Sequence, residues 1–144
     1  METVHYTAGR AGRPLAIAIG KFDGFHIGHR KIVSAVCRCA VSSGLTPAVF
    51  TFRRFPVDFY LVSWEERLRL LAFAGIRRCI WSDFPDIAGW SPEHFIAYLA
   101  GRDVRHVVVG SGFVFGSRRS GDIRFLRRRA ASSGIGVTVV RSVI

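Results

Sequence analysis

Five consecutive apolar residues, Leu15 to Ile19, end at Gly20, and this run places the tightest limit on the fold. A strand with one wet face alternates apolar and polar residues, whereas a continuous apolar run is typical of a strand covered on both faces. A stretch with helical spacing follows from about residue 26 to residue 42, and Gly44 comes after it. A buried strand followed by a helix predicts one unit of a parallel sheet.

The same alternation of strand and helix continues along the 144 residues. Further strands are predicted at 48–52, 79–81, 106–109 and 137–140. Helices are predicted to open at the capping box Ser63–Glu66, at the Ser91–Pro92 pair, and from about residue 121 to residue 132. We therefore expect an α/β fold in a single domain: a Rossmann-like parallel sheet of about five strands with helices on both faces.

The charge of the chain indicates an anionic ligand. The net charge is +11, and Lys21 and Lys31 are the two lysines among 21 basic residues, so the other 19 are arginines. Nucleic acid, a membrane surface and a polyphosphate would all suit this balance. The arginines are spread along the chain, and only 127–129 forms a longer run, which weakens the nucleic-acid alternative. We expect neither a nucleic-acid nor a membrane partner.

Apolar runs and cysteines point to a cytoplasmic protein. The longest purely apolar run is too short to cross a bilayer, and the first 14 residues have no secretory pattern. Cys37, Cys39 and Cys79 are odd in number and form no C-x-x-C pair. A disulfide framework or a zinc knuckle is therefore not expected.

The loop after the first buried strand reads G-K-F-D-G-F-H-I-G-H and carries the clearest chemical signal. Gly20 and Gly24 permit tight turns and leave room for a bound group. His26 and His29 stand three apart at the opening of a helix and share one face, with Gly28 between them. A helix start offers free N–H groups and a positive dipole end, so this combination suits a triphosphate.

Two bland interpretations of the histidine pair stay open on the local pattern. Two histidines at this spacing could bind a metal ion, or they could be incidental residues at a helix start. No carboxylate or cysteine stands at a supporting position nearby, so we assign no metal ligand. The strand–loop–helix context favours phosphate binding over both alternatives.

At these residues the sequence resembles a known family. The loop is similar to the G-x-F-D-G-x-H-x-G-H signature of the cytidylyltransferase-like nucleotidyltransferases. Its form resembles the FMN adenylyltransferase domain of bacterial bifunctional riboflavin kinase/FMN adenylyltransferases, or FAD synthetases. Residues 49–52 and 91–96 are similar to that family's second strand and third helix start, and 108–122 to its V-V-G-x-x-F-x-F-G-x-x-R-x-G-D motif. The similarity runs from about Leu15 to Val140 in the family's order.

The resemblance implies that the substrates are ATP and FMN, that Mg²⁺ bridges phosphates, and that the products are FAD and pyrophosphate. Catalysis would fall to His26 and His29, which would hold phosphate oxygens and stabilise charge on the transferred group. The flavin phosphate would lie near residues 51–56, close to Arg53 and Arg54. The residues expected to bind nucleotide or flavin are Gly20, Lys21, Phe22, Asp23, Gly24, Gly28, Thr51, Phe52, Gly110, Gly112, Phe113 and Arg119.

Local patterns add a structural interpretation for some of these positions. Phe113 and Phe115 are expected to pack beneath the second loop, and Asp122 to cap the following helix. Arg119 could neutralise phosphate charge or be a solvated surface residue. Asp23 could contact an ion or a hydroxyl, or only fix the turn.

The sequence departs from the family in three places. Arg54-Phe55-Pro56 stands where a proline-polar-proline turn is usual, and Gly112 stands where asparagine is common. The chain ends at Ile144, where the family's serine-threonine-arginine segment would begin, and no kinase domain follows. We therefore expect residues 1–144 to form an FMN adenylyltransferase-like domain that is C-terminally incomplete relative to the family.

Three other functions remain open on the sequence. The chain could bind nucleotide or flavin without turnover, or it could transfer a nucleotide to another phosphate as a related enzyme of the same superfamily. It could also be a basic nucleic-acid-binding module. The sequence does not predict an oligomeric state.

Overall fold

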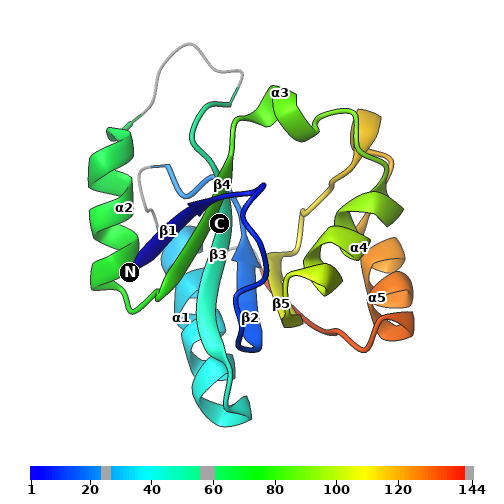
Figure 1. Cartoon of the computed structure of the whole chain (residues 1–144), viewed down its shortest axis with the longest axis horizontal. Helices are drawn as coiled ribbons and strands as arrows, with labels where there is room; N and C mark the ends of the chain where they lie inside the picture. The colour runs from blue at the N-terminus through cyan, green and yellow to red at the C-terminus, as the bar shows by residue number, and fades with distance from the viewer. Residues whose placement is uncertain (24–26, 56–60, 142–144) are drawn as a thin grey trace.

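The predicted strand Leu15–Ile19 forms β2 and lies inside a six-stranded sheet in the order β1-β4-β3-β2-β5-β6. The computed structural model describes residues 1–23, 27–55 and 61–141 (Figure 1). The strands are β1 (Glu2–His5), β2, β3 (Thr46–Phe52), β4 (Arg78–Ser82), β5 (Val104–Gly110) and β6 (Gly136–Val140). The helices are α1 (Ile27–Ser43), α2 (Trp64–Phe73), α3 (Phe84–Ile87), α4 (Pro92–Gly101), the 3₁₀ helix η1 (Ser117–Arg119) and α5 (Ile123–Ser132).

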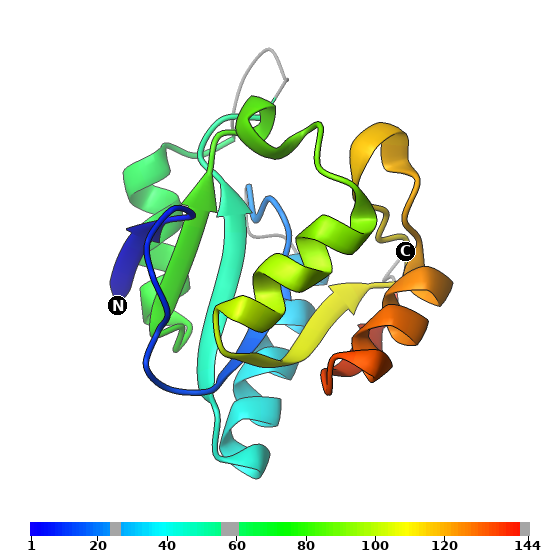
Figure 2. The same cartoon turned by 45° about the vertical axis from the view of Figure 1, so that its right-hand side comes forward.

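The described strands are all paired in parallel, as the alternating pattern predicts. Every residue of β2 is buried, which explains why its sequence is a continuous apolar run. Leu15, Ile17 and Ile19 face a core completed by α3, α4 and α5, while Ala16 and Ala18 face a second core completed by α1 and α2. Figure 2 shows α4 and α5 in front of the sheet and α1 behind it. The predicted fold class is confirmed.

Three predicted helix starts are confirmed by their capping bonds. The Ser63 hydroxyl accepts a hydrogen bond from the Glu66 amide at 3.0 Å, and the Ser91 hydroxyl accepts one from the His94 amide at 3.1 Å. The Asp122 carboxylate accepts one from Phe125 at 2.8 Å, so Asp122 caps α5. Each bond satisfies an amide that the first helical turn leaves without an intrahelical partner.

The sheet has one strand more than the sequence pattern predicts. β1 pairs in parallel with β4, with Glu2 beside Arg78, and forms an edge of the sheet. Its four residues, E-T-V-H, include one aliphatic side chain and are too short to show a period. The Arg78 guanidinium is buried and donates a hydrogen bond to the Glu2 carboxylate, and this charged pair fastens the edge.

The strand order creates a switch point beside β2. From β2 the chain moves outward on one side to β3 and β4, and later returns on the other side to β5 and β6. The loops that follow β2 and β5 therefore leave neighbouring strands in opposite directions. Ligands of open α/β sheets bind in the crevice that such loops form at the carboxyl ends of the strands. Within the described residues, no helix is long and apolar enough to cross a membrane.

Candidate functional site

The loop after β2 is fixed from beneath by its own aromatic residue. Phe22 is fully buried and has φ 54°, a left-handed conformation that is strained for a bulky side chain. A Cβ at Gly20 would lie only 3.2 Å from the tip of the Phe22 ring, so glycine is what lets the ring fold back under the strand end. The Phe22 side chain is thus core, and it could serve a ligand only by shaping the backbone above it.

His29 lies in the first turn of α1 and contacts this buried aromatic residue. The His29 and Phe22 rings are 5.6 Å apart in an edge-to-face arrangement, with an interplanar angle of 67°. His29 is half-buried, so the packing restricts its ring without removing it from the surface. Gly28 belongs to the same helical turn. The first turn of an α-helix offers backbone amides that can bind an anion. Gly24 and His26 lie outside the described residues.

Asp23 ties the loop after β2 to the segment before α2. Its carboxylate accepts hydrogen bonds from the backbone amides of Leu61, at 3.0 and 3.1 Å, and Val62, at 3.1 Å. These bonds give the Asp23 carboxylate a structural role between two loops, and its contact with an ion or a hydroxyl stays a prediction. Among the described residues, no group of three histidine, cysteine or acidic side chains gathers as a metal site would require.

Thr51 and Arg67 hold the same loop from the side of β3. The Thr51 hydroxyl, which is buried, donates to the Lys21 carbonyl at 2.9 Å. Arg67 Nη1 donates to the carbonyls of Lys21, at 2.8 Å, and Phe52, at 2.7 Å, and Nη2 donates to the Arg53 carbonyl at 3.1 Å. The guanidinium also lies over the Trp64 ring at 4.7 Å. The loop after β2 and the end of β3 therefore share two anchoring side chains.

Arg67 was not predicted from the sequence as a residue of the site. It is only 2% exposed, which is rare for an arginine and costly unless the guanidinium is hydrogen-bonded. The helical spacing of α2 could have indicated that Arg67 is buried. Arg67 stands three residues after Trp64 and four before Leu71, so it lies on the helix face that packs inward.

A cationic cavity of about 570 Å³ opens where β3 ends and α2 begins. Its lining includes Arg53, Arg54, Trp64 and Arg67. The Arg53 guanidinium lies 4.5 Å from the centre of the Trp81 ring and forms a two-pronged ion pair with Asp83, at 3.1 and 2.7 Å. This pairing lowers the pKa of Asp83 and raises that of Arg53, so both groups stay charged. The predicted flavin-phosphate segment is described in the structure as far as residue 55. This part of the segment carries a positive charge, on Arg53, whose orientation is fixed by its ion pair.

The predicted aromatic residues of the two loops pack within the protein. Phe52, at the end of β3, makes edge-to-face contacts with Phe50 and Phe84, at 5.8 and 5.4 Å between ring centres. Phe113 is half-buried and stacks on Phe115 at 5.2 Å, and Phe115 is buried in the core. The expected packing of Phe113 and Phe115 beneath the second loop is confirmed.

The loop after β5 begins close to α1 and then runs toward α4. Gly110 ends β5, and a Cβ there would touch Ile32 of α1 at 3.4 Å, so the end of β5 lies beside the first turns of α1. Gly112 is exposed, and a Cβ added to it would meet nothing within 4 Å. Farther along, the Ser117 amide donates to the Trp90 carbonyl at 2.7 Å and fixes η1 near the start of α4. The exposed Arg119 belongs to η1 and is carried with it.

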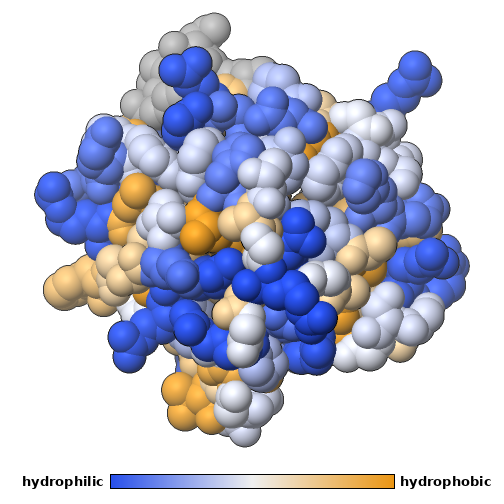
Figure 3. All heavy atoms as spheres, in the orientation of Figure 1, coloured by the Kyte–Doolittle hydropathy of each residue, from blue (hydrophilic) through white to orange (hydrophobic). Residues whose placement is uncertain are grey.

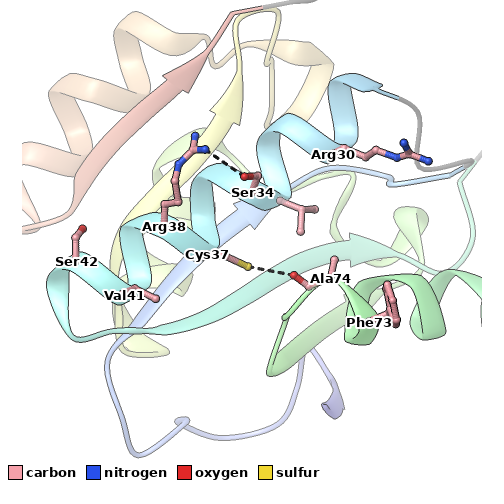
Figure 4. Close-up of a pocket in the computed structure, with 9 residues that line it drawn as sticks. Arg30, Ser34, Cys37, Arg38, Val41, Ser42, Phe73 and Ala74 are labelled. Atoms are coloured by element: carbon pink, nitrogen blue, oxygen red, sulfur yellow. Dashed lines mark hydrogen bonds between the residues drawn. The ribbon is translucent and has the colours of Figure 1, made fainter.

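A second cavity, of about 620 Å³, is unrelated to these loops (Figure 4). It runs along the outer face of α1 to the end of α2, and Cys37, Val41 and Phe73 contribute to its lining. It shares no residue with the set predicted to bind nucleotide or flavin. Burial raises the pKa of the Cys37 thiol, which donates weakly to the Ala74 carbonyl at 3.6 Å. Cys37 therefore has the character of an ordinary half-buried thiol.

Comparison with known families completes this picture. Residues 10–144 match the family model described as FAD synthetase, which is most of the chain. The chain belongs to the FAD synthetase family. The resemblance that the two glycine- and phenylalanine-containing motifs suggested is thereby confirmed.

Curated members of the FAD synthetase family include proteins from bacteria and a plant. The chain is 33% identical over 153 residues to a FAD synthetase of Listeria monocytogenes, with 97% of this chain and 62% of that protein covered. It is 29% identical over 119 residues to a bifunctional riboflavin kinase/FMN adenylyltransferase of Bacillus subtilis, covering 75% and 38%. It is also 28% identical over 145 residues to the chloroplastic FAD synthetase 1 of Arabidopsis thaliana, covering 89% and 38%. The chain spans less than two thirds of the length of these relatives.

A solved structure supports the fold of this FAD synthetase family member. A Streptococcus pneumoniae protein described as a macrolide-efflux protein superimposes with a TM-score of 0.86 at 22% identity. The match covers 99% of this chain and 51% of that one. At this identity the likeness supports the arrangement of the sheet and helices.

Proposed function

We propose that this chain transfers the AMP group of ATP to FMN, giving FAD and pyrophosphate. The proposal draws on membership of the FAD synthetase family and on one observation of the structure. That observation is the shared anchoring of two strand ends: the histidine-bearing loop after β2 and the cationic end of β3 are held together through Lys21, Thr51 and Arg67. Two anionic substrates bound at these two ends would be close enough to react.

In this proposal ATP occupies the switch point between the loops after β2 and β5. The first turn of α1 offers backbone amides to the phosphates, and His29, with His26, holds phosphate oxygens. Gly112 presents no side chain and allows the nucleotide to approach the loop after β5. Arg119 adds positive charge from η1. Mg²⁺ would enter with ATP, held by phosphate oxygens and water, and the described residues supply no step through it.

The phosphate of FMN would lie beside the end of β3, in the cavity lined by Arg53 and Arg54. An oxygen of the FMN phosphate attacks the α-phosphorus of ATP. The bond from that phosphorus to the bridging oxygen breaks, and pyrophosphate leaves with the electron pair. No proton has to be removed from a phosphate that is already ionised. The protein's task is therefore to bring two anions into line and to stabilise the added charge in the transition state.

The surface is compatible with anionic substrates. Hydrophilic residues cover much of the face in Figure 3, and apolar residues show in smaller areas between them. With a net charge of +11, long-range attraction would speed the arrival of ATP and FMN and would weaken as salt is added. A cytoplasmic location and the lack of a nucleic-acid partner stay predictions.

Purified protein incubated with ATP, Mg²⁺ and FMN tests the proposal, with FAD and pyrophosphate measured by chromatography and a coupled assay. The expected result is FAD formation that depends on both substrates. If folded protein binds ATP or FMN in calorimetry but makes no FAD, the chain is a binding domain and the proposal is wrong. If another phosphate acceptor replaces FMN with higher kcat/KM, the reaction class stands and the acceptor is wrong.

A further inference from the structure

Arg67 is the buried arginine of α2, and it donates hydrogen bonds to the main chain of two other segments. Its guanidinium lies beneath three backbone carbonyls, those of Lys21, Phe52 and Arg53, at 2.7–3.1 Å. These carbonyls belong to two segments, and α1 and all of β3 except its last residue lie between them in the sequence. A single side chain is therefore hydrogen-bonded to both the loop after β2 and the end of β3, and it fixes the distance between them.

The planar shape of the guanidinium makes this spacing rigid. Its N–H groups form a fixed fork, so carbonyls that accept from it must keep fixed relative positions. A lysine at the same place has three donors on a rotating ammonium and would hold a similar charge without the same geometry. Stacking of the guanidinium over Trp64 at 4.7 Å, within the same helix, sets the plane of the fork.

The two anchored segments end in the cations of the candidate site. Lys21 is exposed, with Nζ 4.6 Å from the centre of the Phe55 ring, and Arg53 is turned toward Trp81 and Asp83. Arg67 binds the main-chain oxygens of both residues, so it sets where their side chains begin, and it also contributes to the lining of the cavity beside Arg53. A small displacement of one segment would therefore shift Lys21 relative to Arg53.

We propose that Arg67 is a positioning residue that holds the phosphate-binding loop after β2 in line with the end of β3. This inference rests on the proposed adenylyl transfer between ATP and FMN. In-line attack depends steeply on alignment, and a misplacement of about 1 Å can cost about 100-fold in rate. Loss of the fork is therefore expected to lower kcat more than it weakens the binding of either substrate alone.

The test compares Arg67→Met and Arg67→Lys with a matched control, Arg69→Met, at a temperature where circular dichroism shows every variant folded. Arg69 lies on the exposed side of the same helix and pairs with Glu66 at 2.7 Å. We expect Arg67→Met to lower kcat about 10- to 100-fold, with KM for ATP and for FMN changed less. Arg67→Lys should recover part of the rate, and Arg69→Met should match the wild type.

A merely structural role would give a different result. It would lower the melting temperature of both Arg67 variants while kcat per folded molecule stayed at the wild-type value, and that outcome overturns the inference. If Arg67→Met does not fold, Arg67→Lys carries the test: a kcat equal to the wild type in folded Arg67→Lys would also overturn it.

Amide hydrogen exchange separates this inference from the proposed function. Peptides covering 20–23 and 51–54 should exchange faster in Arg67→Lys than in Arg69→Met, whatever the reaction is. If the wild type makes no FAD, the proposed function is wrong, and a positioning role in that reaction is wrong with it. In that case hydrogen exchange reports only whether Arg67 holds the two segments together. If the wild type is active and exchange in both segments is unchanged, the inference alone fails.

Discussion

Thr51 and Lys21 are thirty positions apart, and the buried Thr51 hydroxyl donates a hydrogen bond to the Lys21 carbonyl at 2.9 Å. The bond joins the last residues of β3 to the loop after β2, where Arg67 reaches the same oxygen. A carbonyl oxygen has two lone pairs, and here both have protein donors. The loop is therefore fixed by the neighbouring strand before any ligand is present.

Replacing Thr51 by valine keeps the side-chain shape and removes the donor. We expect Thr51→Val to lower the free energy of unfolding by about 1 kcal/mol, because the Lys21 carbonyl keeps its bond from Arg67. Urea denaturation measures the change. Thr51→Ser keeps the hydroxyl and serves as the control. Equal stability of Thr51→Val and wild type would show that the hydroxyl bond does not hold the loop.

His29 is expected to act in catalysis and not in folding. His29→Asn should lower kcat about 100-fold or more, since it removes the imidazole that we propose holds phosphate oxygens. His94→Asn is the matched control, because His94 is exposed on α4 and stacks on Trp90 at 4.2 Å. FAD formation measured at saturating ATP and FMN decides the matter. A His29→Asn variant with full kcat would remove His29 from the site.

The ion pair between Arg53 and Asp83 is expected to set the affinity for FMN. Asp83→Asn keeps the shape and frees Arg53 from its two-pronged partner, so the guanidinium loses its orientation. KM for FMN should rise about fivefold, equivalent to about 1 kcal/mol, while KM for ATP changes little. Asp86→Asn, in the first turn of the same short helix, provides the comparison. Equal effects on both substrates would argue against a flavin-phosphate site here.

Gly121 is expected to be indispensable for packing. A Cβ at Gly121 would lie 2.8 Å from the Phe115 ring and 3.0 Å from the Phe115 carbonyl, and both residues are joined by a two-bond bridge. Gly121→Ala should therefore destabilise the protein by about 1–3 kcal/mol. Gly89→Ala, with nothing within 4 Å of the new methyl group, should change stability little. Melting temperatures that fall equally in both variants would contradict this account of the loop.

His106 is expected to make stability depend on pH near neutrality. Partial burial lowers its pKa below the ordinary 6.5, and its ring bonds with the Thr138 hydroxyl at 2.7 Å. As pH falls through 6.5, the unfolded chain binds a proton that the folded chain does not, so stability must decrease. The pKa values of Asp83 and Asp103 are lowered from 3.8, and their contributions change only in more acidic solution.

Melting temperatures between about pH 7.5 and about pH 5.5 measure this dependence. His106→Gln cannot take up the proton and should flatten the decline across that interval. His5→Gln, at a position near the opposite edge of the sheet, should keep the wild-type slope. An unchanged slope in His106→Gln would show that another group is responsible.

Much of the fold could be predicted because its signals are local. The buried run of β2 matched the structure at both ends, and the capping residues Ser63, Ser91 and Asp122 marked helix starts correctly. β1 was not predicted, because it is an edge strand whose pairing with β4 depends on residues far along the chain. Local periodicity cannot report a pairing of that kind.

The candidate site likewise has residues that local sequence signals indicate and residues that only the structure shows. Glycines of the loop after β2 stand out in the sequence because turns restrict which residues can stand there, and the roles of His26 and His29 stay predictions. Arg67 was not predicted, because an arginine in a helix with charged neighbours looks like a solvated residue until the carbonyls above it are seen. The burial of the Phe22 ring, at a residue with a left-handed backbone, was not predicted, and a role for Phe22 in binding nucleotide or flavin stays a prediction.

β1 is synthesised before the other strands of the sheet, yet it lies at the outer edge beside a strand made much later. Its partner β4 follows two complete strand-and-helix units, so pairing must close a long loop of chain. Contacts of such high sequence separation tend to form late in folding. The amino-terminal strand should accordingly be the last to pair with the sheet during folding and the first to detach from it during unfolding.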